Sequence, residues 1–216
     1  MSSVGARYKR RGCCCNVCVF LAMAGVVVLV FTELFQSAHI RATVDSATLS
    51  NLTVVVSNAS SAAAVVSYHL AVTLSLHNPS RSESVYYDGI GARLRFRGAV
   101  LGPAANASSP AEFHQRQKAA DAVTLVFDYG GGIGIGGGGG VAGELEEEAR
   151  GEGRVRLELD VEMRVRYVGK VFAVLRVKRR QKPRRRCALS IPVTAEGRRG
   201  RGFGGFLVAG EQCRDM

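Results

Sequence analysis

From Arg154 to Tyr167 the chain reads RVRLELDVEMRVRY, and this stretch decides the fold class. Every odd-numbered position in it is apolar or aromatic, and every even-numbered position is charged. Successive side chains of a β-strand point to opposite faces of a sheet, so the pattern predicts a long strand with one buried face and one face in water. An α-helix would spread the same charges around its whole circumference.

The same period of two recurs along most of the chain after residue 40. Further strands are predicted at Thr43–Leu52, Leu70–Leu76, Leu94–Phe96, Ala122–Phe127, Lys170–Val177, Cys187–Val193 and Phe203–Val208. Clusters of Gly, Pro, Asn and Ser separate them, and no amphipathic helix of three turns stands out. We therefore expect an all-β domain over residues 40–213, folded as an antiparallel β-sandwich.

A glycine tract interrupts the strand pattern. Residues 130–143 contain ten glycines in fourteen positions, followed by the acidic run 144–148. Such a tract buries too little side chain to offset its backbone entropy, which predicts a flexible insertion. Gly132, Gly134 and Gly137 match a dinucleotide-binding template, but a glycine run matches it by chance and no βαβ pattern follows. We expect no nucleotide there.

The N-terminal segment is apolar. Residues 17–32 read VCVFLAMAGVVVLVFT without a charge, and the small residues before them extend the run to about the length of a membrane-crossing helix. We predict a transmembrane helix over 13–35 after a basic tail, residues 1–12. The tail's bases favour a cytosolic N-terminus and an exported remainder. The alternative is a cleaved signal peptide, although the small residues at Ala38 and Ala42 form poor cleavage sites.

The six cysteines fall into two sets. Cys13, Cys14, Cys15 and Cys18 lie at the cytosolic edge of the predicted span. They either line the helix as small apolar residues or carry S-acyl chains, and no second pair completes a zinc or redox motif. Cys187 and Cys213 lie on the exported side, where an oxidising compartment favours a disulfide.

The chain is strongly basic. It has 29 Lys and Arg against 18 Asp and Glu, a net charge of +11. Such an excess favours phospholipid, acidic polysaccharide or nucleic acid as partners. Residues 176–186 hold eight bases in eleven positions, which we interpret as a solvated turn between two strands, with Pro183 ending the first. We expect Arg184, Arg185 and Arg186 to contact anionic headgroups or acidic wall polymer; export would exclude nucleic acid.

Catalytic and metal-binding patterns are absent from the sequence. It contains neither G-x-S-x-G nor H-E-x-x-H, and its four histidines lack ligand spacing. We expect no catalytic residue, no cofactor and no metal. Three N-x-S/T sequons predict N-glycosylation of the exported part, at Asn51, Asn58 and Asn106.

The order of motifs resembles a known family. A basic, Cys-rich N-terminus and apolar span precede ATVDSATL at 42–49, a strand ending LHNP at 76–79, VYYD at 85–88, AEFHQRQK at 111–118 and MRVRYVG at 163–169, before a late pair of cysteines. This order, from about residue 7 to 213, resembles the plant late embryogenesis abundant type-2 proteins, in their harpin-induced, non-race-specific disease-resistance-like membrane branch. Ser80 stands where that family usually has Asn, and the glycine tract is an insertion relative to it.

The resemblance implies an immunoglobulin-like or fibronectin-III-like sandwich outside the plant plasma membrane. It implies roles in pathogen defence and abiotic stress, and it carries over no catalytic residue. We therefore expect a non-enzymatic, membrane-anchored interaction module with a protein partner. The first alternative is a dehydration protectant that binds anionic membrane or wall surfaces nonspecifically. The second is an enzyme acting on wall polymers, which would need two close carboxylates in a cleft. The sequence does not indicate an oligomeric state.

Overall fold

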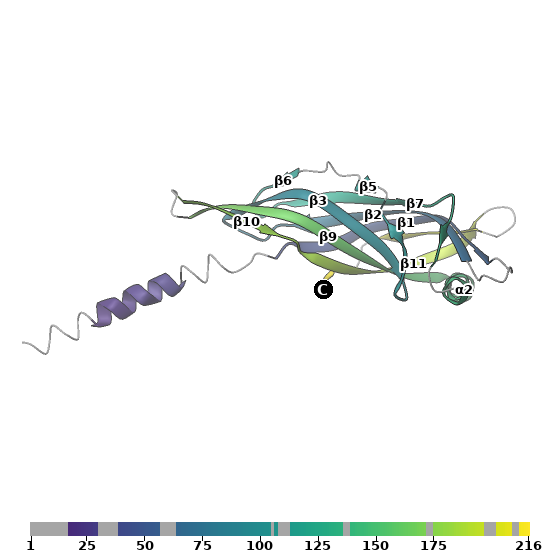
Figure 1. Cartoon of the computed structure of the whole chain (residues 1–216), viewed down its shortest axis with the longest axis horizontal. Coiled ribbons are helices and arrows are strands. Elements are labelled where there is room, and N and C mark those ends of the chain that lie inside the picture. Colours follow the sequence, from purple (N-terminus) through teal and green to yellow (C-terminus); the bar gives the residue numbers. More distant parts are fainter. Residues whose placement is uncertain are drawn as a thin grey trace, which may run out of the picture. The chain divides into compact units, whose positions relative to one another are not determined.

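A computed structural model describes residues 17–29, 39–56, 64–104, 106–107, 113–135, 139–171, 175–196, 202–208 and 212–216. The chain divides into two compact units, Met1–Ala38 and His39–Met216. The larger unit consists mostly of antiparallel strands, which confirms the predicted all-β class (Figure 1).

The smaller unit contains a helix over residues 17–29, all of whose side chains are exposed. The rest of the predicted transmembrane segment, 13–16 and 30–35, and the basic tail lie outside the described residues. Among the helices that the structure describes, none combines the length and apolar character that crossing a bilayer requires.

The strands of the larger unit follow one hydrogen-bonded path. Its order is β4 (Ala99–Pro103), β3 (Glu83–Phe96), β9 (Arg154–Val171), β11 (Arg184–Glu196), β12 (Gly202–Val208), β1 (Arg41–Val56), β2 (Ala64–His77), β7 (Ala120–Asp128) and β5 (Asn106–Ala107). Short strands flank it: β10 (Leu175–Gln181) on β9, β13 (Arg214–Asp215) on β11, β6 (Phe113–Gln115) on β3 and β8 (Ile133–Gly134) on β2.

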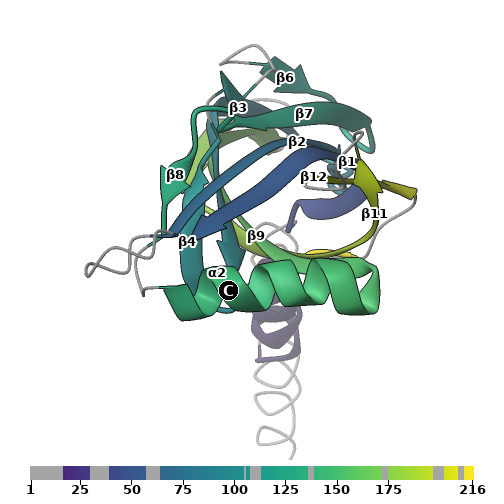
Figure 2. The same ribbon diagram turned by 90° about the vertical axis from the view of Figure 1, so that its right-hand side faces the viewer.

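Strand β11 connects two sheets. Its residues from Arg184 to Pro192 pair with β9, and those from Val193 to Glu196 pair with β12. The path therefore turns at β11, and the apolar faces of both halves form one core, as in a sandwich. Figure 2 shows the strands wrapping around this interior.

Strand β9 confirms the long strand with one buried face that its sequence predicted. Its apolar positions, from Val155 to Tyr167, are all buried, with exposed fractions of 4% or less. Its charged positions face outward between β3 and β11, which pair with it on either side.

Two tyrosines fasten the β4 edge to the other sheet. The Tyr68 hydroxyl on β2 donates to the Leu101 carbonyl at 3.0 Å, and the Tyr129 hydroxyl donates to the Pro103 carbonyl at 2.7 Å. Gly102 lies between these acceptors with a φ of +138°, and a Cβ there would lie 2.5 Å from the Tyr129 ring. These bonds join strands that the hydrogen-bonded path leaves far apart.

The structure of the glycine tract differs from the flexible insertion that was predicted. Residues 136–138 lie outside the described part, but on either side the chain forms β8 and the helix α2 (Gly139–Glu147), which continues as a π-helical turn, Glu148–Glu152. Ala142, Leu145 and Ala149 are buried from this segment. Their spacing places them on one face of the helical segment. Helix α2 lies across one end of the sandwich (Figure 2). Residues 139–143 are therefore helical where a flexible insertion was predicted, and Ile133 and Gly134 pair with β2.

The Asn78-Pro79 step has a structural role. Asn78 is fully buried; its amide donates to the carbonyls of Glu83 at 3.0 Å and Arg116 at 3.1 Å, and its side-chain oxygen accepts from the Ser80 amide. The side chain thus holds together two loops at one end of the domain.

Buried tyrosines should make the domain sensitive to alkali. Burial raises the pKa of Tyr167 from 10.0 to about 12, and it raises the pKa values of Tyr68 and Tyr87 further. Because unfolded tyrosines ionise near pH 10, the unfolded state loses protons first above that pH. We expect full stability below pH 10 and a progressive loss as pH rises to about 12, with roughly 3 kcal/mol coming from Tyr167.

Urea unfolding at a series of pH values, followed together with tyrosinate absorbance, measures this dependence. Tyr167→Phe should flatten part of the decline. A free energy of unfolding that stays constant between pH 10 and 12 would contradict the expectation.

Candidate interface for anionic partners

The middle of the outer face of β3, β9 and β11 is charged but compensated. The register aligns Arg93, Asp160 and Arg186 across the three strands. The Arg186 Nε atom donates to an Asp160 oxygen at 2.8 Å, and Arg95 lies 3.6 Å from the same carboxylate. Opposite charges on neighbouring strands stabilise their pairing, so this part of the face is an ion-pair ladder.

The structure corrects the interpretation of Arg184–Arg186. Arg185 is buried, with 4% of its surface exposed; it donates to the Ile40 carbonyl at 2.7 Å and forms an ion pair with Asp215. Desolvation lowers its pKa. It binds parts of its own domain, so the predicted contact with an anionic surface is wrong for this residue.

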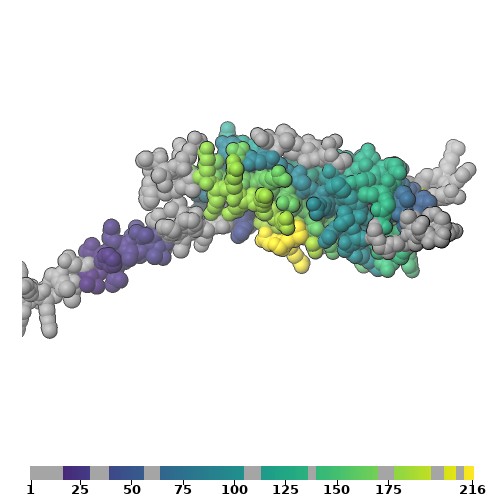
Figure 3. Space-filling model, viewed as in Figure 1, coloured from purple at the N-terminus to yellow at the C-terminus, as the bar shows by residue number. Residues whose placement is uncertain are grey.

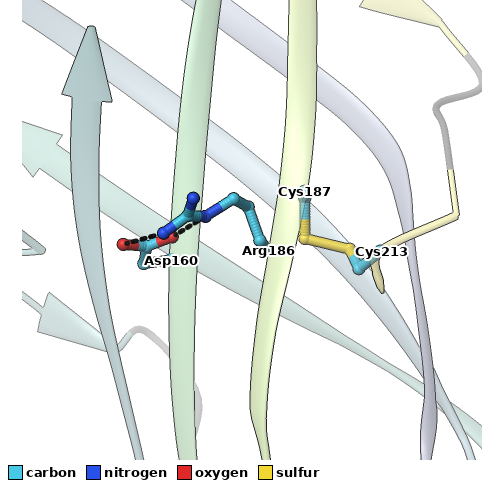
Figure 4. The surroundings of a disulfide bond; sticks show 4 residues. All are labelled: Asp160, Arg186, Cys187 and Cys213. Atoms are coloured by element: carbon cyan, nitrogen blue, oxygen red, sulfur yellow. Dashed lines mark hydrogen bonds and ion pairs between the residues drawn. A yellow bond between two sulfur atoms is a disulfide. The ribbon is translucent and has the colours of Figure 1, made fainter. Parts of the chain in front are cut away.

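Arg184 and Arg186 are exposed but already paired. Arg184 lies 3.7 Å from Glu162, and Arg186 is held by Asp160 (Figure 4). The hydrogen bond that Arg186 donates to Asp160 raises the pKa of Arg186. An external anion would have to compete with these carboxylates.

The basic run 176–186 is not a turn. Most of it lies in β10 and in the start of β11, and only Lys182 and Pro183 connect them. The predicted strand Lys170–Val177 is also wrong, because β9 ends at Val171 and β10 begins at Leu175. Lys178, Arg179 and Arg180 are consecutive bases of β10, and charged side chains are typical of an edge strand.

Five bases at one end of this outer face form what we call the cationic hairpin: Arg164, Arg166, Lys178, Arg180 and Lys182. Four are exposed, and within the part of the chain that the structure describes no carboxylate lies within 4.0 Å of those four. The fifth, Arg166, is bound to Asp88 at 2.6 Å. Figure 3 shows β10, in light green, on an exposed face. Among the described residues, this end of the face therefore has uncompensated positive charge.

An aromatic pair flanks the cationic hairpin. The register aligns His114, Tyr86, Arg166 and Arg180 across β6, β3, β9 and β10. The rings of Tyr86 and His114 lie 4.4 Å apart, and the Arg166 guanidinium lies 5.7 Å from the Tyr86 ring centre. Together with Asp88, this packing restricts Arg166 to one orientation.

Two hollows lie on the outer face. The smaller, of about 270 Å³, adjoins the cationic hairpin and is lined by Gly89, Ile90, Gly91, Glu162 and Arg164. It forms where β3 bulges and two glycines leave side-chain space empty. The larger, of about 490 Å³, lies beside the disulfide and has a mixed lining of Glu158, Arg186, Ala188, Gln212, Arg214, Asp215 and Met216.

The cationic hairpin lies at the end of the domain where the chain enters it. Arg41 pairs with His77, the Asn78 amide contacts Glu83, and Glu83 pairs with Gly169 at the end of β9. The loops at this end add three exposed bases, Arg81, Arg116 and Lys118.

The remaining predicted sites are placed as follows. Cys187 and Cys213 form a disulfide, with an S–S distance of 2.00 Å (Figure 4). Cys18 is exposed and unpaired in the helix 17–29, whereas Cys13, Cys14 and Cys15 lie outside the described residues. Asn51 is exposed in β1; Asn106 lies in β5, its side chain undescribed, and Asn58 is outside the described part.

Among the described residues, no three His, Cys, Asp or Glu side chains gather as metal ligands would. No protein-family model matches the sequence, and no curated protein matches it significantly. The family resemblance therefore stays a prediction based on the ordered motifs.

Proposed function

We propose that this chain is a non-enzymatic, single-pass plasma-membrane protein that displays a β-sandwich outside the cell and acts in plant defence or stress responses. The disulfide between Cys187 and Cys213 is the observation that best supports export of the domain. Disulfides persist in oxidising compartments and are rare in the cytosol. A domain of this size with a continuous core does not need one to fold, which favours compartment as its explanation.

The N-terminal segment supports the anchor. Residues 17–29 present apolar side chains on every side of the helix, as a helix surrounded by lipid does, and the uncharged run continues in the sequence to Thr32. Arg7, Lys9, Arg10 and Arg11 precede it, which favours retention of the N-terminus in the cytosol.

The domain itself is best suited to binding another molecule. Glu158, Asp160 and Glu162 alternate along the outer face of β9, and each lies within 4.0 Å of an arginine. These carboxylates are therefore engaged in ion pairs within the domain. The immunoglobulin-like or fibronectin-III-like subtype belongs to this proposal, because it rests on the family resemblance.

A second function, a stress protectant that binds anionic surfaces nonspecifically, is favoured by the uncompensated charge of the cationic hairpin. The two differ in selectivity. Proximity labelling from outside the cell should find one preferred protein partner for the interaction module. Salt-sensitive binding to many anionic surfaces without preference would favour the protectant.

A protease-protection and glycosylation assay on the full chain tests the topology. External protease should digest the domain in intact cells and spare an N-terminal tag. Endoglycosidase should increase the electrophoretic mobility, and Asn51→Gln should remove one glycan. Thr53→Ser, which keeps the sequon, is the matched control.

Two results would contradict this topology: a domain protected from external protease until the cells are lysed, or a mature chain that begins near His39 and leaves the membrane on carbonate extraction.

A further inference from the structure

We infer that the cationic hairpin binds a linear, carboxylated polysaccharide, with the adjacent hollow accepting a sugar ring. This inference rests on the proposed export of the domain. It goes further by naming the ligand class and the residues that hold it.

Two bases of β10 lie on the outer face, and a third follows the strand. Lys178 and Arg180 alternate with Arg179 on the strand, so they share a face, and Lys182 follows directly after it. Same-face residues of a strand lie about 6.7 Å apart, and neighbouring strands lie about 4.8 Å apart. Arg164 on β9 lies beside this row, whereas Arg166 is held by Asp88. Regularly spaced cations suit a polymer that bears a carboxylate on each sugar.

Strand β10 is held in place by its pairing with β9 and by contacts on its opposite face. Seven residue pairs connect β10 to β9. On the opposite face Arg179 lies over the Tyr167 ring, 5.3 Å from its centre, and 3.3 Å from Glu83. The backbone that carries Lys178 and Arg180 is thus anchored to the sheet, which lowers the entropy that binding would cost.

The hollow supplies a different chemistry. Gly89 and Gly91 leave space next to Arg164, and Glu162 lies at its border. A cation beside a carboxylate can bind a uronic acid, since Arg164 pairs with the sugar carboxylate and Glu162 accepts from sugar hydroxyls. A flat lipid surface would use neither the hollow nor this acceptor.

Compartment also favours polysaccharide over phospholipid. The strong negative surface potential of a membrane belongs to its cytoplasmic leaflet. The disulfide favours the opposite side for this domain. The uncompensated bases therefore face a compartment where carboxylated polymer is the matching polyanion.

The test uses the full chain in vesicles of neutral phosphatidylcholine and measures binding to polygalacturonate. The same polymer with its carboxylates methyl-esterified is the ligand control. We expect binding to the acid form and none to the ester. Replacing Lys178, Arg180 and Lys182 with Gln should weaken binding at least about tenfold and reduce the slope of log K against log salt by about two.

A second triple variant removes the same charge from ion-paired positions of the domain. Arg150, Arg156 and Arg186 have Glu146, Glu152 and Asp160 as partners. Their replacement with Gln should change the affinity by less than about twofold, because these bases are already neutralised. Equal melting temperatures of the two variants would show that both are folded.

Equal weakening in the two variants would overturn the inference, because net charge alone would then explain the binding. Equal binding to the methyl ester would overturn it too, as would tight binding to phosphatidylserine vesicles without polygalacturonate binding. If the protease assay places the domain outside the cell and the protein does not bind the polymer, only this inference is refuted. If the protease assay places the domain in the cytosol, the proposed topology is refuted.

Discussion

Replacing Gly205 with alanine should destabilise the domain by about 3 kcal/mol or more. Gly205 lies in β12 between Leu49 of β1 and Val193 of β11. A Cβ at this position would overlap the Pro192 carbonyl oxygen and lie 2.9 Å from its carbonyl carbon. These are backbone atoms of a paired strand, so relieving the overlap would separate β12 from β11. The melting temperature should fall by roughly 6 to 12 °C.

Gly91→Ala is the matched control. Gly91 also lies in a central strand, β3, but its nearest neighbour to a new Cβ is the Glu162 carbonyl oxygen at 4.0 Å. We expect a change within about 0.5 kcal/mol. Thermal unfolding of both variants measures the difference, and a Gly205 variant that melts with the wild-type protein would refute the close approach of these strands.

The sequence was sufficient to predict the strands whose two faces differ. The alternation from Val155 to Tyr167 arises because one face of β9 packs on the core and the other faces water. The polarity of each residue therefore indicates the face on which it lies. The order of strands in the sheet was not predictable in this way. The junction at β11 depends on which strands lie beside it, and polarity does not encode that.

The glycine tract was misread because its helix signal is weak. Ala142, Leu145 and Ala149 share one face, but two of the three are alanines and glycine fills the positions before them. Burying these three side chains stabilises the helix only because they cover the end of an existing core. Tertiary packing thus overrides a low intrinsic helix propensity.

The sequence could not indicate where on the domain an anionic partner would bind. The basic run 176–186 indicated an anionic partner, yet the sequence did not show which bases are neutralised. Asp160 lies 26 residues from Arg186 along the chain, and Asp88 lies 78 residues from Arg166. Only strand register brings these partners together. The bases without acids opposite them, on β10, therefore became visible only in the fold.

Breaking the disulfide should cost about 3.5 kcal/mol of stability, the chain-entropy value for a closed loop of its length. Cys187 and Cys213 are separated by 26 residues, and both are buried. We expect Cys187→Ala with Cys213→Ala, or added reductant, to lower the melting temperature by roughly 7 to 14 °C.

The loss should also have a local signature. Cys213 donates its amide to the Ala42 carbonyl at 3.0 Å, and Asp215 pairs with the buried Arg185. Without the disulfide, residues 212–216 are retained by these two contacts, the short strand β13, the bridge between Gln212 and Thr43 and the bond from the Met216 amide to the Arg184 carbonyl. Hydrogen exchange should therefore accelerate in this segment before the core strands, and Arg185 should lose its carboxylate partner.

Controls separate the disulfide from other effects of reduction. Cys18→Ser alters an exposed, unpaired thiol and should leave the melting temperature unchanged. Reductant should have no effect on the double alanine variant. If reductant lowered the melting temperature of that variant as much as that of the wild-type protein, the loss would come from elsewhere. The stability assigned to the bond would then be wrong, whereas its formation would still favour an oxidising compartment.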